Sequence, residues 1–153
     1  MDLAVSGLPV DRAVEALARA SLAPSVSFER VRFGGNIVSR IALLGSGTTS
    51  GLNVADLVEP RPAAFAARVV ARALAGRLRD QPVAIVTPEH FVLLKVLSTR
   101  DRDVEDAASV VRALGPRLDL AEVEREAVAL AAEIPDHDVA GRLDRVIRGA
   151  QAP

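Results

Sequence analysis

Residues 87–115, TPEHFVLLKVLSTRDRDVEDAASVVRALG, decide the fold because they predict two consecutive helices of different character. The first helix should begin after Thr87, whose hydroxyl can cap it, and Pro88 suits its first turn. We expect this helix to run from residue 88 to about residue 98, and its side chains are apolar on nearly every side. It should therefore be buried. Asp103 can cap the second helix, whose apolar residues follow a 3.6-residue period.

The sequence around these two helices divides into a strand-rich part before them and a helical part after them. The expected elements are a strand at 3–5, a helix from Val10, a loop at 23–27, a helical turn at 28–33, a β-hairpin of 37–44 and 52–58, a helix at 62–70, strands near 72–78 and 82–86, and helices around 120–130 and 139–147. This order predicts an α+β fold rather than a βαβ alternation. We expect a single domain over 1–153, with a sheet-rich part at 1–86 and a helical part at 87–150.

The composition excludes several classes of function. The 153 residues are half hydrophobic, which is enough to bury the core of one domain. With 19 basic and 20 acidic side chains, the chain lacks the overall positive charge that drives nonspecific binding to nucleic acids. The absence of cysteine excludes thiolate zinc and cysteine nucleophiles, and two histidines are too few for a histidine metal site. Without a signal peptide or a membrane-length apolar run, the sequence predicts a cytoplasmic protein that does not enter a membrane.

Lys95 is the only lysine of the chain and lies in the middle of the apolar helix. A buried ammonium group needs a carboxylate or a phosphate, because leaving it unpaired costs several kcal/mol. The nearby candidate partners are Asp101, Asp103 and Asp106. Lys95 could instead reach the surface, or it could pair with Asp103 only to hold two helices together. The pattern leaves a phosphate-binding role and a structural role open.

Asp2 and Asp56 each stand at an apolar, strand-like run. Adjacent strands could bring both carboxylates to one sheet edge. Clustered carboxylates hold Mg²⁺, which prefers oxygen ligands and assists phosphoryl and nucleotidyl transfer. An aspartate at the end of a strand is also a common turn former, so the spacing leaves both interpretations open.

Three segments together resemble a known family. Residues 87–114 are similar to the C-terminal signature of nucleotidyltransferase-fold proteins of the AbiEii and MenT toxin type. Residues 41–60, IALLGSGTTSGLNVADLVEP, resemble that family's strand, loop and strand with a late acidic residue, which is Asp56. Residues 1–7, MDLAVSG, resemble the end of its Asp-Xxx-Asp strand. The resemblance extends over about residues 1–133.

This resemblance implies a nucleotidyltransferase-like mixed sheet and a magnesium-dependent transfer of a nucleotide from an NTP to an acceptor such as tRNA. It implies that Asp2 and Asp56 hold Mg²⁺ and that Lys95 contacts the phosphates of the NTP. Asp56, Lys95 and Asp103 would be the catalytic residues. A cognate antitoxin would be a further partner.

The sequence departs from the family pattern at its start. The family's Gly-Ser motif and the first aspartate of its metal pair would precede Met1. We therefore expect either a coding start further upstream or a shortened protein that transfers nucleotides poorly. The rival hypothesis is a non-enzymatic remnant or a partner-binding protein of the same fold. An alternative placement uses Gly45 and Ser46 with Asp56 and Glu59, but these two acids would point to opposite faces of a strand.

Overall fold

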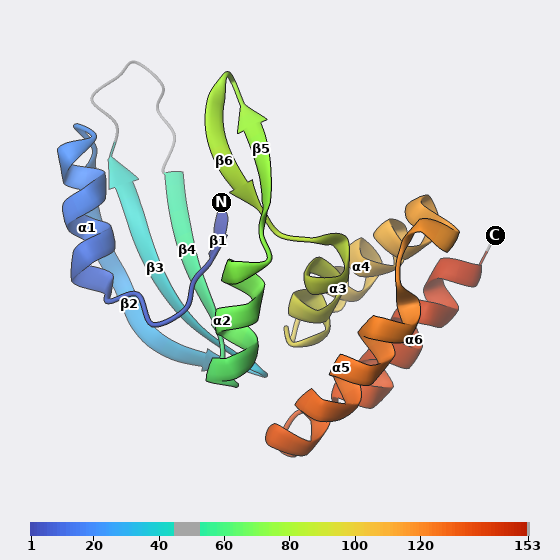
Figure 1. Ribbon diagram of the computed structural model, residues 1–153. Coiled ribbons are helices and arrows are strands. Elements are labelled where there is room, and N and C mark those ends of the chain that lie inside the picture. Colours follow the sequence, from blue (N-terminus) through green and yellow to red (C-terminus); the bar gives the residue numbers. More distant parts are fainter. Residues whose placement is uncertain (45–52, 153) are drawn as a thin grey trace.

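A four-stranded mixed sheet organises the first half of the chain (Figure 1). The computed structural model describes residues 1–44 and 53–152. The sheet consists of β1 (Asp2–Ala4), β4 (Asn53–Pro60), β3 (Asn36–Leu44) and β2 (Ala23–Phe33), in that spatial order. β1 runs parallel to β4, whereas the β4–β3 and β3–β2 pairs are antiparallel. The chain is thus an α+β protein, as the element order of the sequence predicted, and its larger sheet is mixed.

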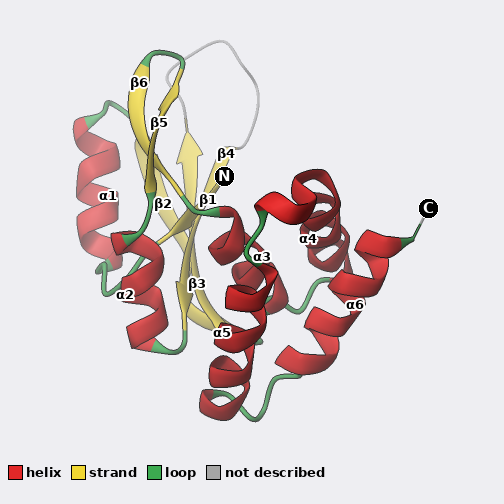
Figure 2. Cartoon of the chain, turned by 45° about the vertical axis from the view of Figure 1, so that its right-hand side comes forward, coloured by secondary structure: helices red, strands yellow, loops and turns green. Residues whose placement is uncertain are grey.

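The two faces of this sheet have different partners. Helix α1 (Val10–Arg19) covers one face and packs against buried side chains of β3 and β4, among them Ile41, Ala55 and Leu57 (Figure 1). Side chains alternate along a strand, so the neighbouring residues of β3 and β4 point to the opposite face. That second face looks toward the helical half of the molecule (Figure 2).

A short helix and a hairpin connect the sheet to the helical half. These are α2 (Ala63–Ala71) and the antiparallel strands β5 (Leu74–Leu78) and β6 (Gln81–Ile85). The helical half then comprises α3 (Pro88–Val96), α4 (Asp101–Leu114), a 3₁₀ turn at Gly115–Arg117, α5 (Leu120–Glu133) and α6 (Val139–Gln151). Helix α3 contacts α4, α5 and α6, and its Val92, Leu93 and Val96 side chains are fully buried, as the hydrophobicity of the helix predicted, whereas Phe91 and Leu94 are only partly buried.

The helix boundaries confirm one of the two capping predictions. Thr87 caps α3 by accepting a hydrogen bond from the His90 backbone at 3.2 Å, and α4 ends immediately before Gly115. The prediction that Asp103 caps α4 was wrong, because this helix begins at Asp101. Asp103 lies in the first turn, where its side chain is buried among cationic partners rather than bound to the helix terminus.

The prediction for residues 23–33 was also wrong. A loop and a helical turn were expected there, but the whole segment is one strand, β2, paired with β3 from Ala23 to Phe33. Two register irregularities interrupt the pairing, and Arg30, which lies in the second of them, has a positive φ of 51°. These irregularities break the alternation by which a strand is recognised, so long-range pairing with β3 determines the structure here.

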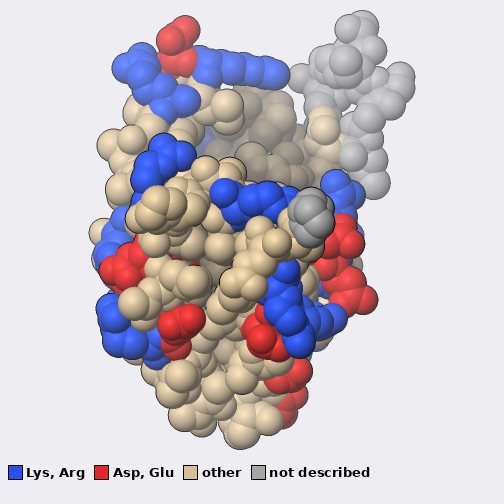
Figure 3. Space-filling model, turned by 90° about the vertical axis from the view of Figure 1, so that its right-hand side faces the viewer, with Lys and Arg blue, Asp and Glu red and all other residues tan. Residues whose placement is uncertain are grey.

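The outer surface of the helical half carries charges of both signs. Figure 3 shows basic and acidic side chains mixed over the face that views this half of the molecule. Ion pairs on it include Arg145 with Asp101 at 3.2 Å and Arg148 with Asp144 at 2.6 Å. Among the described residues, no helix combines the length and hydropathy needed to span a lipid bilayer.

Candidate functional site

A cleft of about 510 Å³ lies between the second face of the sheet and the wall formed by α3 and its turn into α4. The strands supply its floor, and α3 together with the turn after it supplies most of the opposite wall. The lining side chains are Asp2, Ala4, Phe28, Phe33, Asn36, Val38, Arg40, Asp56 and Val58 from the sheet, and Val86, Phe91, Leu94, Lys95, Ser98, Thr99, Arg100 and Asp103 from the wall. All four predicted site residues, Asp2, Asp56, Lys95 and Asp103, therefore converge on this one concave surface.

The floor of the cleft contains one row of side chains across all four strands. Asp2 of β1 is the register partner of Asp56 in β4, Asp56 pairs with Arg40 in β3, and Arg40 pairs with Phe28 in β2. Register partners in a sheet point to the same face. The two predicted acids are thus neighbours, which confirms that adjacent strands bring them together at the β1 edge.

Arg40 forms a bidentate ion pair with Asp56. Its Nε donates to Oδ1 at 2.7 Å and a terminal guanidinium nitrogen donates to Oδ2 at 2.8 Å. These hydrogen bonds lower the pKa of Asp56 below the usual range of an aspartate and outweigh the opposing effect of burial. The Arg40 guanidinium also lies 5.4 Å from the centre of the Phe28 ring, within range of a cation–π interaction. Asp56 is therefore ionised and held in place.

Asp2 is less constrained than Asp56. Its side chain is about half exposed, and its nearest cation is Arg100, whose guanidinium nitrogen lies 4.0 Å from Oδ2. An exposed pair at this separation adds little to stability. Asp2 therefore presents a carboxylate to the cleft that can take a cationic ligand.

Lys95 projects from α3 and is held by two carboxylates. Its Nζ donates to Asp103 at 2.6 Å and to Asp106 at 3.0 Å, which confirms the predicted pairing across the break between the two helices. Burial lowers the pKa of Lys95, but its hydrogen bonds to both carboxylates outweigh that effect and leave this pKa above its ordinary value. The side chain remains 17% exposed, so the cationic group still borders the cleft.

Asp103 binds three donors at once. Besides Lys95, it accepts hydrogen bonds from Ser98 Oγ at 2.5 Å and from Arg100 Nε at 2.8 Å. Burial raises the pKa of Asp103, but the hydrogen bonds from Lys95, Ser98 and Arg100 prevail and lower it overall. With its oxygens occupied in this way, Asp103 is placed to position Lys95 and Arg100.

A buried arginine supports the wall of the cleft from behind. Arg142 on α6 donates to the backbone oxygen of Val96 at 3.0 Å and to that of Arg100 at 2.8 Å. It thus satisfies carbonyl groups at the end of α3 and at the start of α4, fixing the turn that carries Ser98. Burial lowers the pKa of Arg142 below its ordinary value. No sequence pattern distinguishes Arg142 from the other arginines of the chain or predicts that it is buried.

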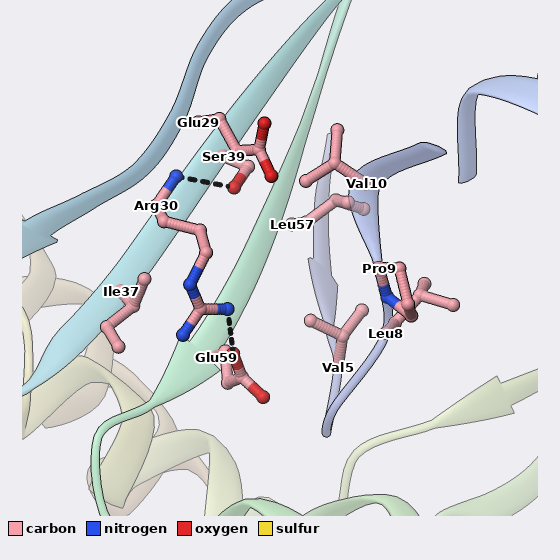
Figure 4. A pocket seen from close by; sticks show the side chains of 10 residues that line it. All are labelled: Val5, Leu8, Pro9, Val10, Glu29, Arg30, Ile37, Ser39, Leu57 and Glu59. Carbon is pink, nitrogen blue, oxygen red and sulfur yellow. Dashed lines mark hydrogen bonds and ion pairs between the residues drawn. The ribbon is translucent and has the colours of Figure 1, made fainter. Parts of the chain in front are cut away.

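The alternative acidic pair is not brought together. Glu59 lies on the α1 side of the sheet, where it binds Arg30 at 3.0 Å beside a small pocket of about 40 Å³ (Figure 4). Asp56 faces the cleft on the other side, as the alternation along β4 predicted. Gly45 and Ser46 lie outside the described residues.

The donor set limits how a metal ion could bind in the cleft. In the described ranges, no group of three or more histidine, aspartate or glutamate side chains is arranged to hold a metal ion. Asp2 and Asp56 offer two carboxylates side by side, and Mg²⁺ in nucleotide sites is commonly bound by one or two carboxylates together with substrate phosphates. The residues therefore fit a magnesium ion that arrives with a phosphate ligand, provided that Asp56 releases at least one bond to Arg40.

Sequence reasoning missed Arg40, Asn36 and the aromatic side chains of the cleft. The first two have no distinguishing pattern around them, and Phe28 and Phe33 were assigned to a helical turn. In comparisons with known proteins, no family model matches the chain and no curated protein is significantly similar to it.

Proposed function

We propose that the cleft binds a nucleoside triphosphate and that the protein is a nucleotidyltransferase with a nucleotidyltransferase-like fold. The nucleotide would pass to an acceptor such as a tRNA. One observation carries this proposal: Asp2 and Asp56 are neighbours on parallel strands in a cleft that Lys95 also lines. Acidic groups for a divalent cation and a basic group for phosphate are the requirements of nucleotide transfer.

Each charged group of the cleft has a role in this proposal. Asp2 and Asp56 would hold Mg²⁺ together with phosphate oxygens, and the bound ion would neutralise developing negative charge. Lys95 would donate to a phosphate oxygen, while Asp103 keeps its ammonium group in place. Arg40 would exchange one or both bonds to Asp56 for a phosphate, which a guanidinium group also binds in a bidentate manner. In the toxin–antitoxin setting of the resembled family, a cognate antitoxin would be a further partner.

The Arg40–Asp56 pair supports a second candidate function. Both oxygens of Asp56 accept hydrogen bonds from Arg40, which leaves Asp2 as the less constrained acid of the pair. A cleft in which this ion pair persists would bind a nucleotide through Lys95 and Arg100 without transferring it. Such a protein would be a non-enzymatic remnant of the fold, which is one form of the rival hypothesis; the other form is a partner-binding protein.

Transfer of label from nucleotides to RNA tests both functions. The chain is incubated with Mg²⁺, each of the four labelled NTPs and total tRNA, and nucleotide binding is measured in parallel by calorimetry. We expect weak label transfer, in line with the departure from the family pattern at the start of the sequence, and Asp56→Ala should abolish it. The matched control is Asp144→Ala, which removes an exposed carboxylate of α6 and should leave transfer unchanged. Binding without transfer would favour the second candidate, and the absence of both would refute the two together.

A further inference from the structure

The part of the cleft beyond the charged row is apolar and aromatic. Phe33 and Phe91 line it, and Phe28, at the β2 end of the row, borders it, although the chain has only four phenylalanines. Phe33 is 42% exposed, and its ring centre lies 6.0 Å from that of Phe28. A partly exposed aromatic pair in a concave surface offers a ligand both apolar area and a ring face.

Asn36 places an unused acceptor in this apolar part. Its side chain is on the cleft face of β3, and the residue is only 4% exposed. Its Nδ2 donates weakly to the backbone oxygen of Leu94 at 3.5 Å, whereas Oδ1 has no partner among the described residues. A buried polar atom without a partner is rare in a folded protein and calls for an explanation. A ligand that donates a hydrogen bond here would satisfy it.

The spacing along β3 relates this acceptor to the charged row. Asn36 precedes Arg40 by four residues, which corresponds to roughly 13 Å along an extended strand. Both residues lie on the same face because side chains repeat every second residue. A ligand that fills the cleft is therefore charged at one end and flat, apolar and hydrogen-bond donating at the other.

We infer that the aromatic part of the cleft binds the base of a nucleotide, and that Asn36 Oδ1 accepts a hydrogen bond from an exocyclic amino group of that base. This inference rests on the proposed nucleotide site and names its substrate class. A lipid chain would suit the aromatic rings but has no donor for Asn36. Inorganic phosphate or polyphosphate would occupy only the charged row. A base that stacks on Phe33 and donates to Asn36 satisfies both features.

Calorimetric titration of the full chain separates the two ends of the cleft. The four probes are ATP, purine riboside triphosphate, which lacks the amino group, tripolyphosphate and adenosine. We expect ATP to bind about tenfold or more tightly than tripolyphosphate, because base stacking adds to phosphate binding. Purine riboside triphosphate should bind roughly two- to tenfold more weakly than ATP, the usual effect of losing one hydrogen bond.

Phe33→Ala should reduce the preference for ATP over tripolyphosphate to near unity. The matched control is Val26→Ala, since Val26 is equally exposed on the same strand but does not line the cleft. This variant should bind all four probes as the wild type does. Both substitutions remove exposed side chains, so both variants should fold.

The four probes also separate failure of this inference from failure of the proposed function. Equal binding of ATP and tripolyphosphate in the wild type would overturn the base site. Phosphate binding by the charged row would still be supported. Adenosine binding that Phe33→Ala abolishes, without any tripolyphosphate binding, would uphold the base site and refute the nucleotidyltransferase proposal. Binding of none of the probes would overturn both. Equal binding of ATP and purine riboside triphosphate would overturn the role of Asn36.

Discussion

Replacing Lys95 by methionine tests how the wall of the cleft is held. The substitution keeps an apolar stem of similar length but removes the hydrogen bonds to Asp103 and Asp106. Asp103 keeps Ser98 and Arg100 as donors, so the compensation of its negative charge is reduced but not lost. The free energy of unfolding should therefore fall by about 1–3 kcal/mol, which is less than the cost of a fully unpaired buried charge. For a chain of this size, that loss lowers Tm by about 2–10 °C.

The measurement is thermal and urea unfolding followed by circular dichroism, because the chain has no tryptophan or tyrosine to report by fluorescence. Arg19→Met is the control, since it removes a cation whose pairing with Glu15 is exposed and long at 3.9 Å. The free energy of unfolding of Arg19→Met should be almost the same as that of the wild type. If Lys95→Met and Arg19→Met were equally stable, the ion pairs of Lys95 would contribute nothing and the reasoning would be refuted.

The stability difference should also depend on pH. Asp103 has a lowered pKa in the folded protein, so its contribution is present above the unfolded pKa and is lost as pH falls through the folded pKa. The gap between wild type and Lys95→Met should therefore be largest near neutral pH and narrow below about pH 4. A gap that stays constant down to pH 2 would show that it does not arise from Asp103.

The same variant tests phosphate binding. We expect ATP with Mg²⁺ to raise the Tm of the wild type, because a ligand that binds only the folded state stabilises it. That shift should disappear in Lys95→Met, since the group proposed to contact the phosphates is gone. If Lys95→Met had a lower Tm but ATP with Mg²⁺ still raised its Tm as in the wild type, Lys95 would stabilise the fold without contacting the phosphates.

Three further substitutions test the elements around the cleft. Arg142→Met should lower the free energy of unfolding by about 1–3 kcal/mol in urea, because the Val96 and Arg100 carbonyl groups lose a charged donor and keep only His137 Nε2 and the Asp103 backbone as partners; a loss below about 0.5 kcal/mol would contradict this. Gly34→Ala should destabilise more than Gly7→Ala: both glycines have a φ of 61°, but a Cβ at Gly34 would lie 2.9 Å from a backbone oxygen, whereas Gly7 is open. Equal losses would show that backbone conformation alone matters. Arg40→Gln should enlarge the rise of Tm with Mg²⁺ because Asp56 loses its competing cation; an unchanged rise would mean that no metal ion binds there.

The features that were predicted correctly from the sequence depend on short-range chemistry. Thr87 caps its helix because the local sequence provides a hydroxyl, a proline and an acid in the right order. Lys95 and Asp103 meet because only eight residues and one turn separate them. In both cases the partners lie close along the chain, so local patterns were sufficient.

The features that were missed depend on pairing between distant strands. The strand state of residues 23–33 comes from β3, and no regular alternation reveals it. Arg40 lies on the floor of the cleft because the register of β3 and β4 pairs it with Asp56, which is sixteen residues away in the sequence. The free acceptor of Asn36 likewise arises from the packing of β3 on α3, which no local pattern encodes.

The register of β4 is the physical origin of the acidic floor. Ala55 and Leu57 are buried against α1, and this burial fixes which residues of β4 face that helix. Because side chains alternate, Asp56 between them is forced onto the opposite face, beside Asp2. A slip of one residue would bury the carboxylate against α1 without Arg40 and expose two apolar side chains in the cleft. The hydrophobic core on one side of the sheet therefore positions the charged site on the other.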